Sequence, residues 1–137
     1  MTAREFLSQP YKLNHILSLR LTALESHREK SPCRTIDFSG LPKGSSRGSS
    51  QVEETALKLV EAEAEIRELE DKLELSRKAV YETIRRVGDI ESETILELRY
   101  LAYLDWSTIS GKLDYSLSTL FRKHREALRL VRVPTET

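Results

Sequence analysis

The sequence predicts an all-α protein, with an N-terminal antiparallel helical hairpin or coiled coil and a C-terminal helix-turn-helix module. Apolar residues recur at helical spacing near the N-terminus, a seven-residue apolar repeat follows, and three short amphipathic segments end the chain. We divide the chain into an N-terminal helix over residues 1–30, a flexible Gly/Ser/Pro linker over 31–50, a long coiled-coil helix over 51–88 and the module over 89–132.

The N-terminal stretch has the features of an amphipathic helix. Thr2 and Glu5 stand at the spacing of a capping box. Apolar residues then follow at helical spacing, namely Phe6, Leu13, Leu17, Leu21 and Leu24. Pro10 lacks the N–H that a helix interior uses, so we expect either a kink there or a helix that begins at the proline.

Residues 31–50 are rich in Ser, Gly and Pro and hold too few apolar residues to form a core. We interpret them as a flexible link between two helices. Extra phosphate contacts from Lys43 and Arg47 are the alternative role for this segment.

The long helix carries the strongest periodic signal of the chain. One apolar seam repeats every seven residues, at Val52, Leu59, Ile66, Leu73, Val80 and Val87. A second, weaker seam lies at Thr55, Ala62, Leu69, Ser76 and Thr83. Such a repeat favours packing against another helix, either the N-terminal helix of the same chain or a second copy, and both can occur together. Gly88 and Asp89 are predicted to end this helix and to cap the next one.

Three short helices are predicted for the module, at about residues 90–103 and 106–113 and from Ser116 onward. Two short helices joined by a tight turn are typical of a helix-turn-helix. Asp114 stands at the turn position where glycine is common and can adopt the left-handed conformation at some cost. Tyr115 would then fill the corner, Ser116 would cap the last helix, and Leu120 would bury against Ile109.

Residues 95–131 resemble region four of the bacterial sigma factors and the related phage regulators, through the stretch ILELRYLAYLDWSTISGKLDYSLSTLFRKHREALRLV. The order of segments in the whole chain resembles the ArpU/RinA group of phage late-gene transcriptional regulators. Asp114 in place of glycine and Phe121 on the outer face depart from that pattern. The resemblance implies a sequence-specific DNA-binding transcriptional regulator, a late-gene activator that works as a homo-oligomer, with a dimer favoured. It also implies a location in the bacterial host cytoplasm and contact with the host RNA polymerase.

The last helix would be the recognition helix, which enters the major groove with its N-terminal end first. Ser118, Thr119 and Arg122 are placed for base edges, and basic residues further along, including Arg132, are placed for phosphates. The predicted DNA-binding residues are Ser116, Ser118, Thr119, Arg122, Lys123, Arg125 and Arg129. Trp106 and His124 are interpreted as core residues, whereas Phe121 would touch a thymine methyl or bury against the coiled coil or a second subunit.

Charge is distributed unevenly along the chain. The net charge is zero, but residues 1–50 carry 8 basic and 4 acidic side chains, residues 51–105 carry 8 and 15, and residues 106–137 carry 6 and 3. Because charges act over a Debye length of about 8–10 Å, the basic end can meet double-stranded DNA while the acidic middle repels it or faces a basic partner.

Several classes of protein are excluded by composition and motifs. With 32% charged residues and no apolar run of about 20 residues, we expect a soluble cytoplasmic protein without a membrane contact. Cys33 is the single cysteine, the three histidines are scattered, and no phosphate-cradling glycine motif is present. We therefore expect no enzyme, no cofactor and no metal. The alternative functions are a DNA-packaging subunit similar to a phage small terminase, and a coiled-coil adaptor that does not bind DNA.

Overall fold

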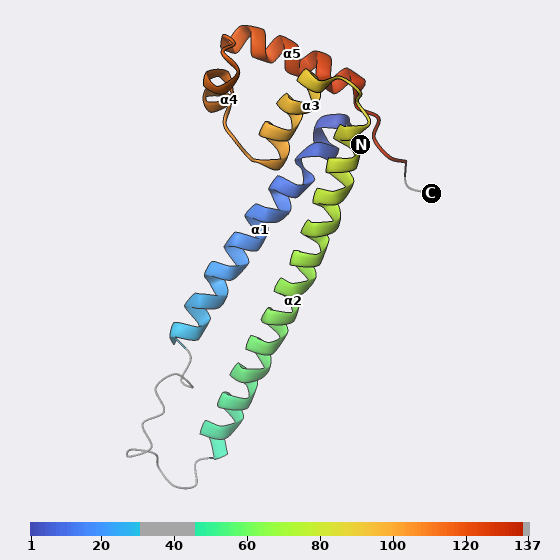
Figure 1. Cartoon of the computed structure of the whole chain (residues 1–137). Helices are drawn as coiled ribbons and strands as arrows, with labels where there is room; N and C mark the ends of the chain where they lie inside the picture. The colour runs from blue at the N-terminus through green and yellow to red at the C-terminus, as the bar shows by residue number, and fades with distance from the viewer. Residues whose placement is uncertain (31–45, 136–137) are drawn as a thin grey trace. The chain divides into compact units, whose positions relative to one another are not determined.

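The computed structural model describes residues 1–30 and 46–135, and the regular elements within these ranges are helices (Figure 1). They are α1 (Ala3–Lys30), α2 (Ser46–Arg85), α3 (Ile90–Leu96), the π-helical segment η1 (Glu97–Leu101), α4 (Trp106–Leu113) and α5 (Leu117–Leu130). The all-α prediction is confirmed for the described residues. Residues 31–45 of the predicted linker lie outside them, and α2 begins at Ser46, five residues before the predicted start.

The chain forms two compact units. Unit 1 comprises Met1–Asn14 and Lys72–Thr137, and unit 2 comprises His15–Asp71. Both α1 and α2 are therefore divided between the two units. All three short C-terminal helices and η1 belong to unit 1.

The start of α1 confirms the predicted capping box. The Thr2 N–H donates to Glu5 Oε2 at 3.1 Å, and the Glu5 N–H donates to Thr2 Oγ1 at 3.2 Å. Pro10 lies inside the helix and is buried, so the alternative in which the helix begins at the proline is wrong. The preceding turns keep their helical hydrogen bonding, and the Phe6 N–H donates to the Thr2 carbonyl at 3.0 Å.

The buried residues Pro10, Leu17 and Leu24 of α1 recur every seven positions and form a stripe. Leu13, three residues after Pro10, is half-buried. One heptad beyond Leu13, the equivalent position is Arg20. Leu21 therefore falls outside the stripe and is 42% exposed, so its prediction as an apolar-face residue is wrong.

Burial along α2 follows the two predicted seams. Val80 and Thr83 are buried in unit 1 and Ile66 in unit 2, and the other seam residues of the helix are half-buried except Val52. In unit 2 the pairing of α1 with α2 includes two exposed ion pairs, Arg28–Glu63 at 2.5 Å and Arg20–Glu65 at 3.6 Å. Exposed pairs of this kind contribute little to stability, so the apolar seam carries the packing.

Two hydrophobic clusters form the core of unit 1, and neighbouring residues of α3 contribute to different ones. Leu96 joins the larger cluster, together with Phe6 and Leu7 of α1, Val80 and Ile84 of α2, and Tyr100, Ala127 and Val131. Ile95 joins Ile109 of α4 and Leu120 of α5 in the second cluster. The predicted burial of Leu120 against Ile109 is confirmed. Helix α3 thus holds α4 and α5 on one side and the ends of α1 and α2 on the other.

The connection from α4 to α5 is short and internally bonded. Asp114 has the left-handed conformation, with φ 57° and ψ 37°, and its N–H bonds the Ser110 carbonyl. The Ser110 hydroxyl in turn donates to the Tyr115 carbonyl, and Tyr115 packs against the second cluster. Ser116 caps α5 by accepting from the Thr119 N–H at 3.2 Å. The predicted turn residue, corner residue and cap are therefore confirmed.

Candidate functional site

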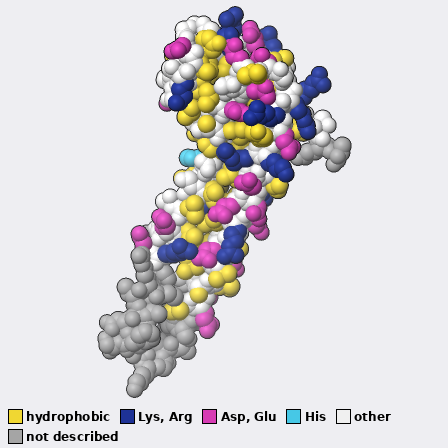
Figure 2. Space-filling model, in the orientation of Figure 1, with side chains coloured by type: hydrophobic (Ala, Val, Ile, Leu, Met, Phe, Trp, Pro, Cys, Tyr) yellow, Lys and Arg dark blue, Asp and Glu magenta, His cyan; other side chains and the backbone are white. Residues whose placement is uncertain are grey.

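Helix α5 has one packed and one exposed face. Leu120, His124 and Ala127 are buried. Ser118, Arg122, Arg125 and Arg129 are exposed, and their spacing of three and four residues places them on one side of the helix. The face of unit 1 seen in Figure 2 shows Lys and Arg side chains with Asp and Glu between them. Four of the seven predicted DNA-binding residues are thus brought together on a surface open to solvent.

The other predicted residues at the start of α5 have bonds within the helix. Ser116 Oγ lies 2.9 Å from Thr119 Oγ1 and 3.3 Å from Ser118 Oγ, besides accepting from the Thr119 N–H. Thr119 is half-buried. The local role of Ser116 and Thr119 is to end the turn and start the helix, and Ser118 is exposed.

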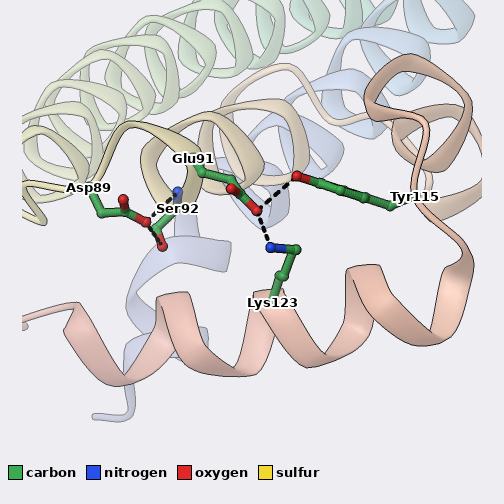
Figure 3. Close-up of polar contacts among 5 residues, drawn as sticks. All are labelled: Asp89, Glu91, Ser92, Tyr115 and Lys123. Atoms are coloured by element: carbon green, nitrogen blue, oxygen red, sulfur yellow. Dashed lines mark hydrogen bonds and ion pairs between the residues drawn. The ribbon is translucent and has the colours of Figure 1, made fainter.

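Lys123 is the predicted phosphate contact whose charge is already paired. Figure 3 shows Glu91 of α3 between Lys123 and Tyr115. Glu91 Oε1 accepts from Lys123 Nζ at 2.5 Å and from the Tyr115 hydroxyl at 3.1 Å. The Lys123 bond, and then the Tyr115 bond, lower the pKa of Glu91, and Glu91 raises the pKa of Lys123. The contact ties α3 to α5 and to the turn before it, which gives Lys123 a structural role.

The cap of α3 stands beside this contact (Figure 3). Asp89 Oδ2 accepts from the Ser92 N–H at 3.2 Å and from the Ser92 hydroxyl at 2.7 Å, and these two bonds lower the pKa of Asp89. Gly88 precedes it with φ +84°. The predicted end of the long helix and the cap of the next one are confirmed.

His124 is a core residue, as the sequence predicts. Its Nε2 lies 2.8 Å from the Tyr100 hydroxyl, and the two rings stack with centroids 5.7 Å apart. Burial, followed by the positive charges of Arg4, Arg99 and Arg125, lowers the pKa of His124 to about 4. The ring is therefore neutral at neutral pH, and its Nε2 shares a hydrogen bond with the Tyr100 hydroxyl.

Trp106 and Phe121 form an aromatic pair at the edge of the second cluster. Trp106 is half-buried and packs against Ile95, Ile109 and Leu120, which agrees with its interpretation as a core residue. Phe121 is 38% exposed, and its ring meets the edge of Trp106 at a centroid distance of 5.5 Å. The Phe121 ring thus has an intramolecular partner while part of it faces solvent.

A cavity of about 610 Å³ opens beside this pair, inside unit 1. Three arginines line it: Arg4 from the first turn of α1, Arg99 from η1 and Arg125 from α5. Asp105 is the acidic residue of the lining. Only Arg125 among these residues was predicted as functional. The others were missed because they come from segments far apart in the sequence, and no spacing pattern links them.

Comparison with known proteins gives no match: no protein-family model, curated protein or solved structure is similar to the chain. Within residues 1–30 and 46–135, no three His, Cys, Asp or Glu side chains come together as metal ligands would. None of the helices described there has both the length and the apolarity to cross a membrane. The resemblance to sigma region four therefore stays a hypothesis that depends on the residues of this chain.

Proposed function

We propose that the protein is a sequence-specific DNA-binding transcriptional regulator of the phage late-gene activator type, and that it reads DNA with α5. The observation that carries the proposal is the exposed row of Arg122, Arg125 and Arg129 on a helix whose opposite face is buried. A helix held by its apolar face leaves its cationic face free to lie along a duplex. No carboxylate of the described residues forms an ion pair with these three arginines.

In this proposal α4 and α5 are the two helices of a helix-turn-helix. Asp105 caps α4 by accepting from the Thr108 N–H at 2.7 Å, Asp114 makes the turn, and Ser116 starts α5. Because the N-terminal end of a recognition helix enters the major groove first, Ser118 and Arg122 would meet base edges. Arg125 and Arg129 would then meet phosphates, which position the protein without specifying sequence.

The long helices would set the oligomeric state. We propose that α1 and α2 form an antiparallel hairpin that presents two copies of the module to paired half-sites about 34–36 Å apart, one helical turn of DNA. The buried seams of α1 and α2 support pairing within each unit, and exposed apolar residues such as Leu57 and Val60 of α2 are available for a second copy. The partners proposed are a second copy, double-stranded DNA and the host RNA polymerase, in the cytoplasm of the host.

The test is a selection of binding sites from random duplexes, followed by fluorescence anisotropy with the selected duplex in a salt series. Arg122→Ala should reduce affinity for the selected site by about 1–3 kcal/mol and relax the base preference at one position. Arg129→Ala should weaken binding to all duplexes about equally and reduce the salt slope by about 1. Arg67→Ala, an exposed arginine of α2 in unit 2, is the matched control and should change neither.

Two results would contradict the proposal. Failure of the selection to enrich any sequence, with no effect of either α5 variant on duplex retention, would favour the coiled-coil adaptor. A ring of eight or more subunits that binds DNA would favour a packaging subunit over a regulator. Sedimentation velocity of the full chain, with and without the selected duplex, distinguishes that ring from a dimer.

A further inference from the structure

The cavity of unit 1 combines positive charge with aromatic walls. Its volume of about 610 Å³ lies in the range of roughly 300–1,000 Å³ that small-molecule sites occupy. The lining comes from α1, from η1 and the segment after it, and from α4 and α5. Its three arginines face a single aspartate, and His124, which also lines it, is neutral at pH 7.

The three guanidinium groups converge and lack carboxylate partners. No ion pair among the described residues involves Arg4, Arg99 or Arg125. All three line the same cavity as His124. Asp105, the one carboxylate of the lining, accepts from the Thr108 N–H at 2.7 Å. With three guanidinium groups and one carboxylate, the lining keeps a net positive charge that an anion would satisfy.

Arg99 is held in place by uncharged groups. Arg99 Nη1 donates to the Leu104 carbonyl at 3.1 Å, and its Cζ lies 4.8 Å from the Trp106 ring centroid. Arg4, on the first turn of α1, is exposed and lines the same cavity. Guanidinium groups with such support keep most of their five donors for a ligand. Positioned arginines suit phosphate because the planar group can bind two oxygens at once.

The aromatic walls are also fixed. Tyr11 meets Tyr103 edge to face at a centroid distance of 5.6 Å, and Trp106 meets Phe121 in the same way. Tyr103 has φ 60°, a conformation that residues other than glycine rarely adopt. Arg77 holds it there by donating to its hydroxyl at 2.7 Å, so the ring is kept at the cavity despite the backbone cost.

The π-helical turn contributes to the same wall. In η1 the Ala102 N–H bonds the Glu97 carbonyl at 2.9 Å, five residues back, which widens the turn that carries Arg99 and Tyr100. Such turns are rare and occur often at functional sites. Tyr103, which follows η1, belongs to neither buried cluster, so core packing does not account for its strained backbone.

We propose that this cavity binds a nucleotide, with the phosphate on the guanidinium groups of Arg4, Arg99 and Arg125 and the base against Trp106 and the neighbouring aromatic rings. An anion alone would not require the aromatic walls, and an aromatic ligand alone would not require three arginines. A nucleotide has a phosphate for the arginines and an aromatic base for the walls, and it fits a cavity of this volume. The site does not depend on the DNA-binding function proposed above.

The test uses Trp106, the only tryptophan of the chain, as the reporter. The full-length protein is titrated, without DNA, with the 5′-monophosphates of adenosine, guanosine, cytidine and uridine, with the four nucleosides, and with inorganic phosphate. At least one monophosphate should change the Trp106 fluorescence with saturation, and it should bind more tightly than its nucleoside and than phosphate. Isothermal titration calorimetry of the same pairs provides a second readout.

Arg4→Gln should weaken that binding by about tenfold or more, because a charge-assisted hydrogen bond is lost. Arg4 is exposed on the first turn of α1, so the variant should fold, which far-UV circular dichroism checks. Arg86→Gln is the matched control, an exposed arginine of unit 1 that does not line the cavity, and it should bind the nucleotide as the parent protein does.

Three results would overturn the proposal. The first is the lack of saturable binding by all four monophosphates. The second is equal binding of phosphate alone, which would remove the role of the aromatic walls. The third is an Arg4-dependent response to a short DNA duplex but to none of the monophosphates, which would make the cavity part of a DNA surface. The first two results leave the proposed DNA binding by α5 untouched, and the third would extend the DNA surface to the cavity while it refutes a site for free nucleotide.

Discussion

The buried histidine of α5 gives unit 1 a stability that depends on pH. In the folded protein the pKa of His124 is about 4, compared with 6.5 for an unperturbed histidine. Between these values the unfolded chain binds a proton that the folded chain excludes, so the free energy of unfolding rises with pH. The contribution is complete above the unfolded pKa of 6.5 and is lost as the pH falls toward 4.

The size of the effect follows from the two pKa values. At pH 5 almost every unfolded chain carries a protonated His124, whereas most folded chains do not, so acidification from pH 7.5 to 5 should cost about 2 kcal/mol. Urea unfolding followed by circular dichroism, at intervals of half a pH unit, measures this slope. His124→Gln keeps a group that can accept the Tyr100 hydroxyl but cannot titrate in this range.

The comparison of the two proteins isolates the histidine. Asp89, Glu91 and Asp105 also have lowered pKa values, so their protonation in acid decreases the free energy of unfolding as well. This decrease is the same in the parent protein and in His124→Gln. The difference between the two slopes therefore reports His124 alone. Tyr100→Phe should retain the slope of the parent protein, because burial is the main cause of the shift. Identical slopes for the parent protein and His124→Gln would refute a buried neutral histidine.

Substitutions at the turns and in the core test the packing described for unit 1. Asp114→Gly should stabilise the protein by about 0.5–1 kcal/mol in urea unfolding, since glycine adopts φ 57° without strain, and a loss of stability would contradict this. Gly88→Ala should cost about 1 kcal/mol through its φ of +84° alone, because an added Cβ would meet no atom within 4 Å. Ile109→Ala should cost about 2–5 kcal/mol, and a smaller loss would mean that the second cluster is loosely packed.

Features that depend on near neighbours could be predicted from the sequence. The capping bonds of Thr2 with Glu5, of Asp89 with Ser92 and of Ser116 with Thr119 each join residues three apart, so the pattern itself contains both partners. The two seams of the long helix were predicted for the same reason, because a heptad repeat repeats its own geometry.

Features that depend on distant partners could not be predicted. The sequence predicts a phosphate contact for Lys123, because it gives no sign that Glu91, 32 residues earlier, lies beside it. The exposure of Leu21 depends on which of two adjacent heptad positions pairs with α2, and a single helix does not determine that choice. The switch to a π-helical turn after Leu96 likewise serves the packing of Tyr100 and has no local signature.

The two proposals meet at Arg125, which lies on the exposed face of α5 and also lines the cavity. A guanidinium group bound to a nucleotide phosphate is less available to a DNA phosphate, so the two ligands should compete for one charge. Coupling between binding sites is reciprocal, so a nucleotide that weakens DNA binding must itself be bound more weakly in the presence of DNA, by the same factor.

Anisotropy with the selected duplex, at saturating and zero nucleotide, measures that factor. Arg125→Gln should bring this coupling factor close to one, whereas Arg122→Gln should leave it unchanged. A coupling factor that persists in Arg125→Gln would show that the coupling runs through another group.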